Sequence, residues 1–299
     1  MTVFQLYLKM SNASIEKGVP SAEQGFVLGA DTGSTNSLLL SLFGLFVFDV
    51  PARSVIATQL AITALAQVGV TQSSTRMTLN RMVNRGLLTR VRAGRTSSFG
   101  LSEEGLALLA RGRERMFDPH PFNLGSAAWT LLNAMPPAAP AGARYQFETR
   151  LSWAGFAAID TRLWIAPGKV DLQVVFGDLL PAQSLAGLCV FHGVPATPTL
   201  MESLVSKAWD IPAIRAAHMR FLDAWEQVPA LTEQALANLI RLAENWAQLL
   251  RSDPGLPGSV LDEHWPAQRS VATFQRLFGA WTQHAAQQFK ALEESGAAE

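Results

Sequence analysis

Thr71-Gln-Ser-Ser-Thr-Arg-Met-Thr-Leu-Asn-Arg-Met-Val-Asn-Arg-Gly86 is the stretch on which the fold assignment depends. Leu79, Met82 and Val83 recur at helical spacing, and most of the polar side chains fall on the other side of the same helix. The hydroxyl groups at the start of the stretch are suited to cap a helix, and Gly86 is a typical helix stop. We therefore predict an amphipathic helix with an exposed face rich in hydrogen-bond donors.

The segments on either side of this stretch complete a recognisable set of elements. They predict, in chain order, a helix at 37–48, a helix at 54–69 capped by Ser54, two strands at 87–92 and 96–101, and a helix from Ser102 onward. Three helices, a hairpin and a further helix are the parts of a winged helix-turn-helix. We place this domain at 35–118 and expect it to bind duplex DNA.

The charge distribution supports the same interpretation. The whole chain has a formal net charge of +0, but residues 36–118 hold ten arginines against five acidic residues, a local charge of +5. A basic segment inside a neutral chain is typical of a module that binds phosphate. All ten basic residues are arginine, which forms bidentate contacts with phosphate and guanine.

Candidate DNA contacts lie on the polar face of the predicted helix and in the hairpin. Arg76 and Asn80, one turn apart, are the candidates for base edges, whereas Arg81 and Arg85 would position the backbone. The full predicted set is Ser73, Ser74, Arg76, Met77, Asn80, Arg81, Asn84, Arg85, Arg92 and Arg95. Ser73 and Ser74 would meet phosphates at the helix N-terminus, and Arg92 and Arg95 would reach phosphate or a minor groove.

The remaining chain predicts two further domains and a poorly ordered extension. We expect an α+β, mainly helical protein with an unordered segment at 1–34, a ferredoxin-like α+β domain at 119–198 and a helical domain at 199–299. The elements expected there are strands at 129–132, 161–166 and 184–192, a helix at 143–153, an ambiguous segment at 170–180, and helical patterns at 201–228, 231–250 and 266–294.

Composition narrows the class of protein. The longest apolar run is about a dozen residues, short of the ~20 needed to span a bilayer, and the N-terminus has no signal-peptide pattern. The single cysteine, Cys189, excludes an internal disulfide framework. We therefore expect a cytoplasmic protein, with Cys189 as a buried strand thiol.

Motifs for catalysis or metal binding are weak. Asp31-Thr-Gly-Ser34 matches the aspartic-protease signature once only, and that enzyme class needs two such aspartates. The five histidines have no partners at metal-ligand spacing, so we expect no metal site. The middle domain also resembles the small ferredoxin-like nucleases of CRISPR adaptation, which hold a metal with an acidic residue at the end of their first strand. At the corresponding place, this chain has Asn133-Ala-Met135, with no carboxylate. We expect no enzyme and no cofactor.

Several motifs taken together resemble the PaaX-type repressors, regulators of phenylacetic acid catabolism. The segments that carry the resemblance are Ser37-Leu-Leu-Leu-Ser-Leu-Phe-Gly44, 74–86, Gly94-Arg95, Trp153-Ala-Gly-Phe156, Leu163-Trp-Ile-Ala-Pro167, Ala208-Trp-Asp210, Arg251-Ser-Asp-Pro-Gly-Leu-Pro257 and Trp265-Pro266. The resemblance implies a winged helix, a ferredoxin-like middle domain and a helical C-terminal domain. It also implies a homodimer on a partly palindromic operator, released by an acyl-coenzyme A thioester such as phenylacetyl-CoA.

An effector of that kind would need apolar lining for its acyl group and cationic side chains for its phosphates. The residues that the resemblance makes eligible are Arg150, Arg162, Trp164, His192 and Arg251. Arg251 could equally form a structural ion pair or helix cap with Asp253. Two other functions stay open, a nucleic-acid-processing enzyme built on the middle domain and a regulator of the same fold that acts through a protein partner.

Overall fold

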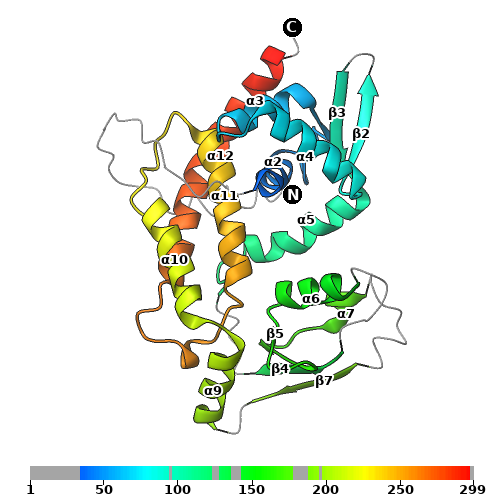
Figure 1. Cartoon of the computed structure of the whole chain (residues 1–299). Coiled ribbons are helices and arrows are strands. Elements are labelled where there is room, and N and C mark those ends of the chain that lie inside the picture. Colours follow the sequence, from blue (N-terminus) through cyan, green and yellow to red (C-terminus); the bar gives the residue numbers. More distant parts are fainter. Residues whose placement is uncertain are drawn as a thin grey trace. The chain divides into compact units, whose positions relative to one another are not determined.

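The computed structural model describes residues 34–93, 96–122, 128–135, 143–177, 188–194 and 197–296 (Figure 1). The chain forms two compact units. Unit 1 is drawn from Met1–Arg115, Leu222–Trp246 and Ala272–Glu299, and unit 2 from Met116–Phe221 and Ala247–Val271. The predicted extension at 1–34 lies outside the described residues except for Ser34. The segment 199–299 does not form a compact unit by itself, because its helices divide between the two units.

The N-terminal part of unit 1 contains helices and a small antiparallel sheet. Its elements are α2 (Thr35–Phe46), β1 (Val55–Ala57), α3 (Thr58–Ala66), α4 (Gln72–Asn84), β2 (Leu88–Ala93), β3 (Thr96–Leu101) and α5 (Glu103–Met116). The three strands are arranged in the order β1-β3-β2, and β2 and β3 form a hairpin that is easily followed in Figure 1. Leu39, Leu42, Phe43 and Leu65 are fully buried among these elements.

The helix expected from Ser54 onward begins later than the sequence predicts. Residues Val55–Ala57 form strand β1, which pairs with β3 so that Ile56 faces Phe99 across the ladder. Both of these side chains are buried. Two consecutive β-branched residues fit a pleated surface better than a helix, and Ile56 finds a buried partner there.

The C-terminal helices complete unit 1 with an aromatic core. Parts of α10 (Ile211–Trp225), α11 (Ala235–Ser252) and α12 (Ala267–Gly296) belong to this unit. Their largest buried side chains are Trp225, Trp246, Phe274, Trp281 and Phe289. No helix within the described ranges is both long enough and apolar enough to cross a membrane.

The end of α12 packs directly on the N-terminal elements of unit 1. The ring of Phe289 stacks on Phe46 with 4.3 Å between centroids. Arg53 donates two hydrogen bonds to Glu293, from Nε at 3.1 Å and from Nη2 at 2.5 Å, and a third to the carbonyl of Phe46. This bidentate pair fixes the last turns of α12 in unit 1.

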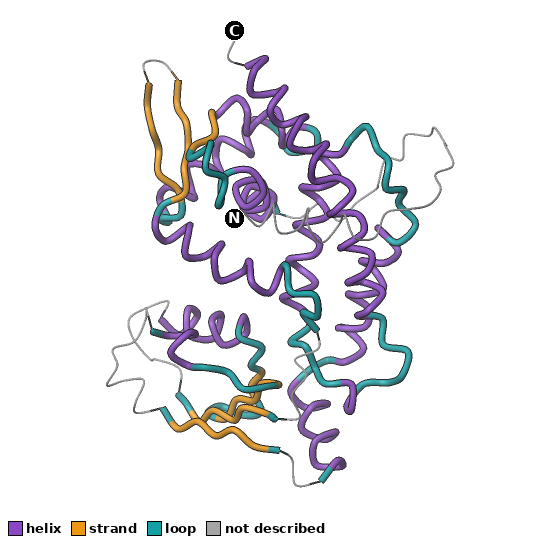
Figure 2. The backbone as a smooth tube through the Cα atoms, turned by 180° about the vertical axis from the view of Figure 1, so that it is seen from behind, coloured by secondary structure: helices purple, strands orange, loops and turns teal. Residues whose placement is uncertain are grey.

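Unit 2 is built on a four-stranded antiparallel sheet with the order β5-β6-β4-β7. Its strands and helices are β4 (Trp129–Asn133), α6 (Ala143–Trp153), β5 (Ala157–Ala158), β6 (Leu163–Pro167), α7 (Leu172–Phe176), β7 (Cys189–Gly193), α9 (Pro198–Ala208), the first part of α10 and the short helix η1 (Gly258–Val260). Figure 2 colours the strands of both sheets orange.

Both faces of this second sheet are covered. Leu132 and Ala166 belong to one buried cluster together with Phe147 of α6 and Phe176 of α7. On the other face, Trp129 and Ile165 pack in a second cluster with Met201, Val205 and Ile214 from α9 and α10, and with Leu256. Alternate residues of β4 and β6 thus serve two cores, which explains why these strands are almost uniformly apolar.

The helical pattern expected at 201–228 consists of two helices, α9 and α10. Asp210 lies between them, and its carboxylate accepts a hydrogen bond from the amide of Ala213 at 2.9 Å. An aspartate cap followed by Pro212 is a signal for a new helix start. The segment 170–180 was ambiguous from the sequence. Its described part, up to residue 177, contains the short helix α7, which is capped by Asp171, and residues 178–180 lie outside the described ranges.

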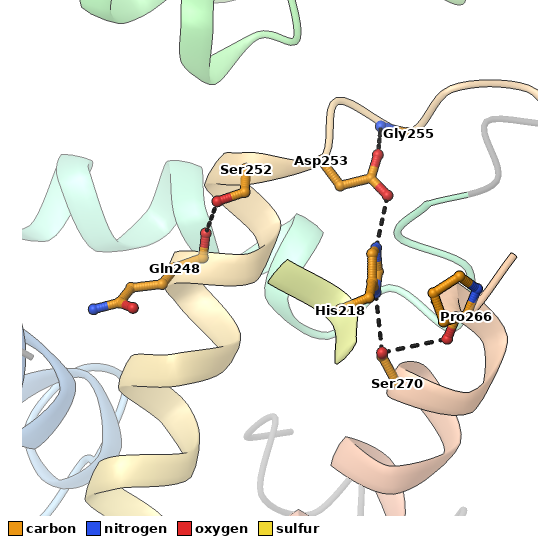
Figure 3. A network of polar contacts seen from close by, with 7 residues as sticks. All are labelled: His218, Gln248, Ser252, Asp253, Gly255, Pro266 and Ser270. Carbon is orange, nitrogen blue, oxygen red and sulfur yellow. Dashed lines mark hydrogen bonds and ion pairs between the residues drawn. The ribbon is translucent and has the colours of Figure 1, made fainter. Parts of the chain in front are cut away.

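A buried polar network joins three segments of unit 2 (Figure 3). His218 on α10 lies between Asp253, which follows α11, and Ser270 near the start of α12. The distance is 2.9 Å from Nε2 to Asp253 Oδ2 and 3.0 Å from Nδ1 to Ser270 Oγ. The amide of Gly255 donates to the second carboxylate oxygen of Asp253 at 2.7 Å. The side chains of His218, Asp253 and Ser270 are all buried, so their hydrogen bonds are made within the protein, and Ser270 also contacts the carbonyl of Pro266 at 3.3 Å.

Two glycines of α5 provide a matched test of packing. A Cβ atom at Gly105 would lie 2.2 Å from the carbonyl oxygen of Leu87, whereas one at Gly112 would meet no atom within 4 Å. We expect Gly105→Ala to lower the free energy of unfolding by about 1–3 kcal/mol because the backbone must shift. Gly112→Ala should raise it by up to about 1 kcal/mol through helix propensity. Urea denaturation of both variants measures the difference, and equal stabilities would contradict this packing of α5.

Candidate nucleic-acid interface

Helix α4 is buried along one side only. Thr75, Thr78, Leu79 and Met82 are buried, with exposed fractions between 0% and 3%. The exposed residues of the helix and of the position after it are Gln72, Ser73, Arg76, Met77, Asn80, Arg81, Asn84 and Arg85. Because the buried stripe fixes the rotation of the helix about its axis, the polar face is held toward solvent.

Both ends of α4 are defined by local hydrogen bonds. The hydroxyl of Thr71 accepts from the amide of Ser74 at 3.2 Å and caps the first turn. At the other end, Gly86 has a φ of +74° and its amide donates to the carbonyl of Val83. That left-handed conformation favours glycine and ends the helix just before β2 begins.

Strand β2 places a second arginine beside the exposed face of α4. Arg90 donates a hydrogen bond from Nη2 to the amide oxygen of Asn80. Its guanidinium carbon lies 5.2 Å from the centre of the Phe99 ring, a cation–π contact. Asn80 is therefore held by the hairpin, and its amide NH2 group stays available as a donor.

Two arginines of α4 itself, Arg76 and Arg81, are positioned by neighbours on the same helix. The side-chain amide of Gln72 is oriented so that its oxygen faces Arg76. This oxygen accepts from Nη2 of Arg76 at 3.0 Å and from Nε at 3.2 Å. Arg81 donates to the hydroxyl of Thr78 at 3.3 Å. Both arrangements leave the remaining guanidinium donors at the surface, because Arg76 and Arg81 are exposed.

The positive charge of this face is not neutralised by carboxylates. Within the described residues, no ion pair to Asp or Glu is formed by Arg76, Arg81, Arg85, Arg90 or Arg92. Elsewhere in unit 1, by contrast, Arg53 pairs with Glu293, and Arg113 pairs with Asp49 at 3.1 Å. We name the exposed residues of α4 together with Arg85, Arg90 and Arg92 the α4–β2 face. An uncompensated cationic surface of this kind attracts polyanions.

Most of the predicted DNA contacts lie on the α4–β2 face. Ser74 differs, since it is only partly exposed and its hydroxyl lies 2.9 Å from that of Thr35. Arg95 lies outside the described residues. Arg90 was missing from the predicted set, although its spacing of two from Arg92 indicates the same side of a strand.

The residues considered for an effector do not form one cluster. Trp164 is buried in the sheet, and Arg150 donates to the carbonyl of Val175 at 3.1 Å. Arg251 lies over the ring of Trp153, 5.6 Å from its centre. Arg162 is exposed in the turn before β6. The backbone amides of Arg162 and Leu163 both donate to the carboxylate of Asp160, and these hydrogen bonds, that of Arg162 most, lower the pKa of Asp160.

Of these five residues, His192 is the one that lines an open surface cavity in unit 2. This cavity has a volume of about 380 Å³ and is lined by Lys169, Val170, Asp171, Leu172, Gln173, Val190 and His192. Thr130 contacts His192 Nδ1 at 3.0 Å, donates to the carbonyl of Gly168 and accepts from the amide of Val170. Since the single hydroxyl proton of Thr130 goes to Gly168, His192 Nδ1 is the donor, and Nε2 is left as an acceptor in the neutral ring.

No group of three or more His, Cys, Asp or Glu side chains is arranged to hold a metal ion within the described ranges. Strand β4 ends at Asn133, an exposed amide rather than a carboxylate. Cys189 is exposed, in contrast to the buried thiol expected from the apolar run around it, because its strand lies at the edge of the sheet.

Comparisons with known proteins give relatives for both ends of the chain. Residues 34–105 match the family described as PaaX-like protein, and residues 209–291 match the PaaX-like protein C-terminal domain. The chain is 22% identical over 230 residues to the transcriptional repressor PaaX of Escherichia coli (strain K12), an alignment that covers 71% of each protein.

A solved structure also resembles this fold over most of the chain. The uncharacterized protein Rv0674 from Mycobacterium tuberculosis matches with a TM-score of 0.53 and 22% sequence identity, covering 87% of this chain and 99% of that one. At this identity the likeness concerns the fold alone. The two family matches together span more than half of the residues, so this chain belongs to the family of PaaX-like proteins.

Proposed function

We propose that this protein is a transcriptional repressor that binds duplex DNA through a winged helix-turn-helix formed by α2 to α5. The observation that carries the proposal is the α4–β2 face, a one-sided polar surface with five arginines that are not paired with carboxylates. Membership of the PaaX-like family supports the same function, since the relative in E. coli is named a transcriptional repressor.

In this proposal, α4 enters the major groove. Arg76 and Asn80 would contact base edges, with arginine suited to guanine and asparagine to adenine. An amide oxygen has two lone pairs, so Asn80 can accept from Arg90 and still pair with an adenine. Exposed Met77 would contact a thymine methyl group. The residues left for phosphates are Ser73, Ser74, Arg81, Asn84, Arg85, Arg92 and Arg95.

The further parts of the proposal follow the family. We propose a homodimer on a partly palindromic operator, because a two-fold protein reads two equal half-sites. The operon would belong to phenylacetate or related aromatic acid catabolism, and an acyl-CoA thioester would release the protein from DNA. The cavity at His192 is the candidate place for part of that effector, with Lys169 as a cation for its phosphates.

Salt dependence tests the phosphate contacts. A site enriched from a random duplex library provides the specific DNA, and an unrelated duplex provides the non-specific DNA. Arg92→Ala should weaken binding to both and reduce the slope of log affinity against log salt by about 0.9, the value for one phosphate contact. Arg220→Ala, which removes a charge that is also exposed, from α10, is the control and should leave the slope unchanged. Identical slopes in both variants would contradict the assigned face.

Base preference tests the two residues proposed to read sequence. We expect Asn80→Ala and Arg76→Ala each to lose discrimination at one base position, by about 1–3 kcal/mol or roughly 5- to 150-fold. Affinity for the unrelated duplex should change little in Asn80→Ala. Gln268→Ala removes an exposed amide in unit 2 and serves as the control. Selection of binding sites by each variant measures the effect; unchanged preferences would exclude α4 as the reading helix.

Titration with thioesters tests the effector. Phenylacetyl-, benzoyl- and short-chain acyl-CoA should release the enriched duplex, measured by fluorescence anisotropy, with a change in tryptophan emission. His192→Ala should raise the concentration needed for release, whereas His264→Ala, an exposed histidine away from the cavity lining, should not. No release by the whole panel would favour a regulator that responds to a protein partner.

The enzymatic alternative has a direct test. Incubation of single- and double-stranded nucleic acid with Mg²⁺ or Mn²⁺ should give no cleavage, because β4 ends in Asn133 rather than in a carboxylate. Cleavage that persisted in purified protein would overturn the assignment as a regulator alone.

A further inference from the structure

Strand β2 lies beside α4 (Figure 1) and brings one arginine, Arg90, to the surface of that helix. Leu88 begins the strand and is 2% exposed. Arg90 lies on the same side of the strand, because alternate residues share a side. It pairs in register with Phe99 of β3, which is 3% exposed, and its guanidinium carbon lies 5.2 Å from the centre of that ring. The buried ring thus anchors the outer part of the Arg90 side chain.

The guanidinium group of Arg90 contacts α4 through one side chain. Its Nη2 donates to the amide oxygen of Asn80, and both residues are exposed. Within the described part of the chain, Arg90 forms no ion pair with Asp or Glu, so no carboxylate draws it away from this contact. Phe99, Arg90 and Asn80 therefore form a chain of contacts from the core to the exposed face of the helix.

Arg90 selects one of two orientations of the Asn80 amide. The terminal torsion of asparagine is broad and roughly two-fold, so its oxygen and its NH2 group can exchange places. With the oxygen toward β2, Arg90 and Asn80 form a charge-assisted hydrogen bond. With the NH2 group there, two donors would face each other. The cation therefore holds the oxygen toward the strand and leaves the NH2 group on the other side of the amide.

The orientation of an asparagine amide matters for a base pair in the major groove. Adenine offers N7 as an acceptor beside the donor N6, whereas cytosine offers only the donor N4. An amide whose NH2 group faces the base can donate to N7 and accept from N6 with a lone pair of its oxygen. An amide turned the other way presents its oxygen and can accept from cytosine. An unrestrained asparagine can therefore meet either base.

We propose that Arg90 is a positioning residue that restricts Asn80 to adenine, so that the β2–β3 hairpin influences which sequence is read without contacting that base. The inference rests on the proposed function, in which α4 enters the major groove. Asn80 still makes the contact, and Arg90 acts through it.

This role differs from the one proposed for Arg92, two residues along the same strand. Arg92 would contact phosphate, whereas the guanidinium of Arg90 is engaged within the protein by Asn80 and Phe99. Because the amide of Asn80 is held before DNA binds, less side-chain entropy is lost when the complex forms. Arg90 therefore acts on base preference, and Arg92 on affinity for any duplex.

Matched substitutions in β2 test this difference. Arg90→Met keeps an apolar stem over Phe99 but cannot donate to Asn80. We expect sites selected from a random duplex library to lose about 5-fold or more of their discrimination between adenine and cytosine at the position read by Asn80. Arg92→Met, the same substitution two residues along, should instead lower the slope of log affinity against log salt by about 0.9 and keep the base preference. Arg90→Lys keeps a cation with a donor and should retain part of the preference.

A double variant shows whether Arg90 acts through Asn80. Asn80→Ala already removes the discrimination at this position, so adding Arg90→Met should cause no further loss there. Effects of the two substitutions that add would mean that Arg90 works independently of Asn80, and would overturn the positioning role. The melting temperature of each variant reports on folding. Base preference is a ratio of two affinities for the same preparation, so a lower folded fraction does not change it.

The outcomes separate this inference from the proposed function. If the unmodified chain selects no sequence from the library, both the proposed function and the role of Arg90 are overturned. If it selects a site and Arg90→Met selects the same site with the same base preference, the positioning role alone is overturned. In that case the proposed repressor and its other DNA contacts would still hold.

Discussion

The one-sided burial of α4 is the constraint on which the proposed DNA contacts depend. Four side chains, Thr75, Thr78, Leu79 and Met82, leave the helix a single orientation about its axis. The threonine cap and the left-handed Gly86 then fix where it begins and ends. Because a helix has 3.6 residues per turn, burying this stripe exposes the opposite side along the whole length. Among the described residues, the five arginines of the α4–β2 face form no ion pair with Asp or Glu, so the orientation of α4 leaves their charge at the surface.

Much of the fold was predictable where local signals are strong. The helix at 143–153 and the hairpin at 87–101 were predicted within a residue or two of their observed bounds. The sequence was less informative where a segment depends on a distant partner. Val55–Ala57 becomes a strand only because β3 lies beside it. The division of 199–299 between two units also follows from contacts such as Phe46 with Phe289, which no local pattern reveals.

The candidate site shows the same difference between local and distant information. Arg76 and Asn80 could be assigned to one face because helical spacing alone relates them. The contact of Arg90 with Asn80 joins a strand to a helix and needed the structure. The effector residues were selected from motifs scattered along the chain, and the fold distributes them among α6, the turn before β6, β6 itself, β7 and α11. Nothing in their spacing could show which of them shares a cavity with Lys169.

The network around His218 has a consequence for how this sequence can vary among relatives. Asp253, His218 and Ser270 lie on three separate segments but satisfy one another inside the protein. Replacing one of them alone leaves a buried polar group without its hydrogen-bond partner, which lowers the free energy of unfolding by about 1–3 kcal/mol. Replacing all of them by apolar residues of similar volume can be nearly neutral. Natural selection therefore acts on the three positions jointly, and they should co-vary in an alignment, although 52 residues separate the first from the last.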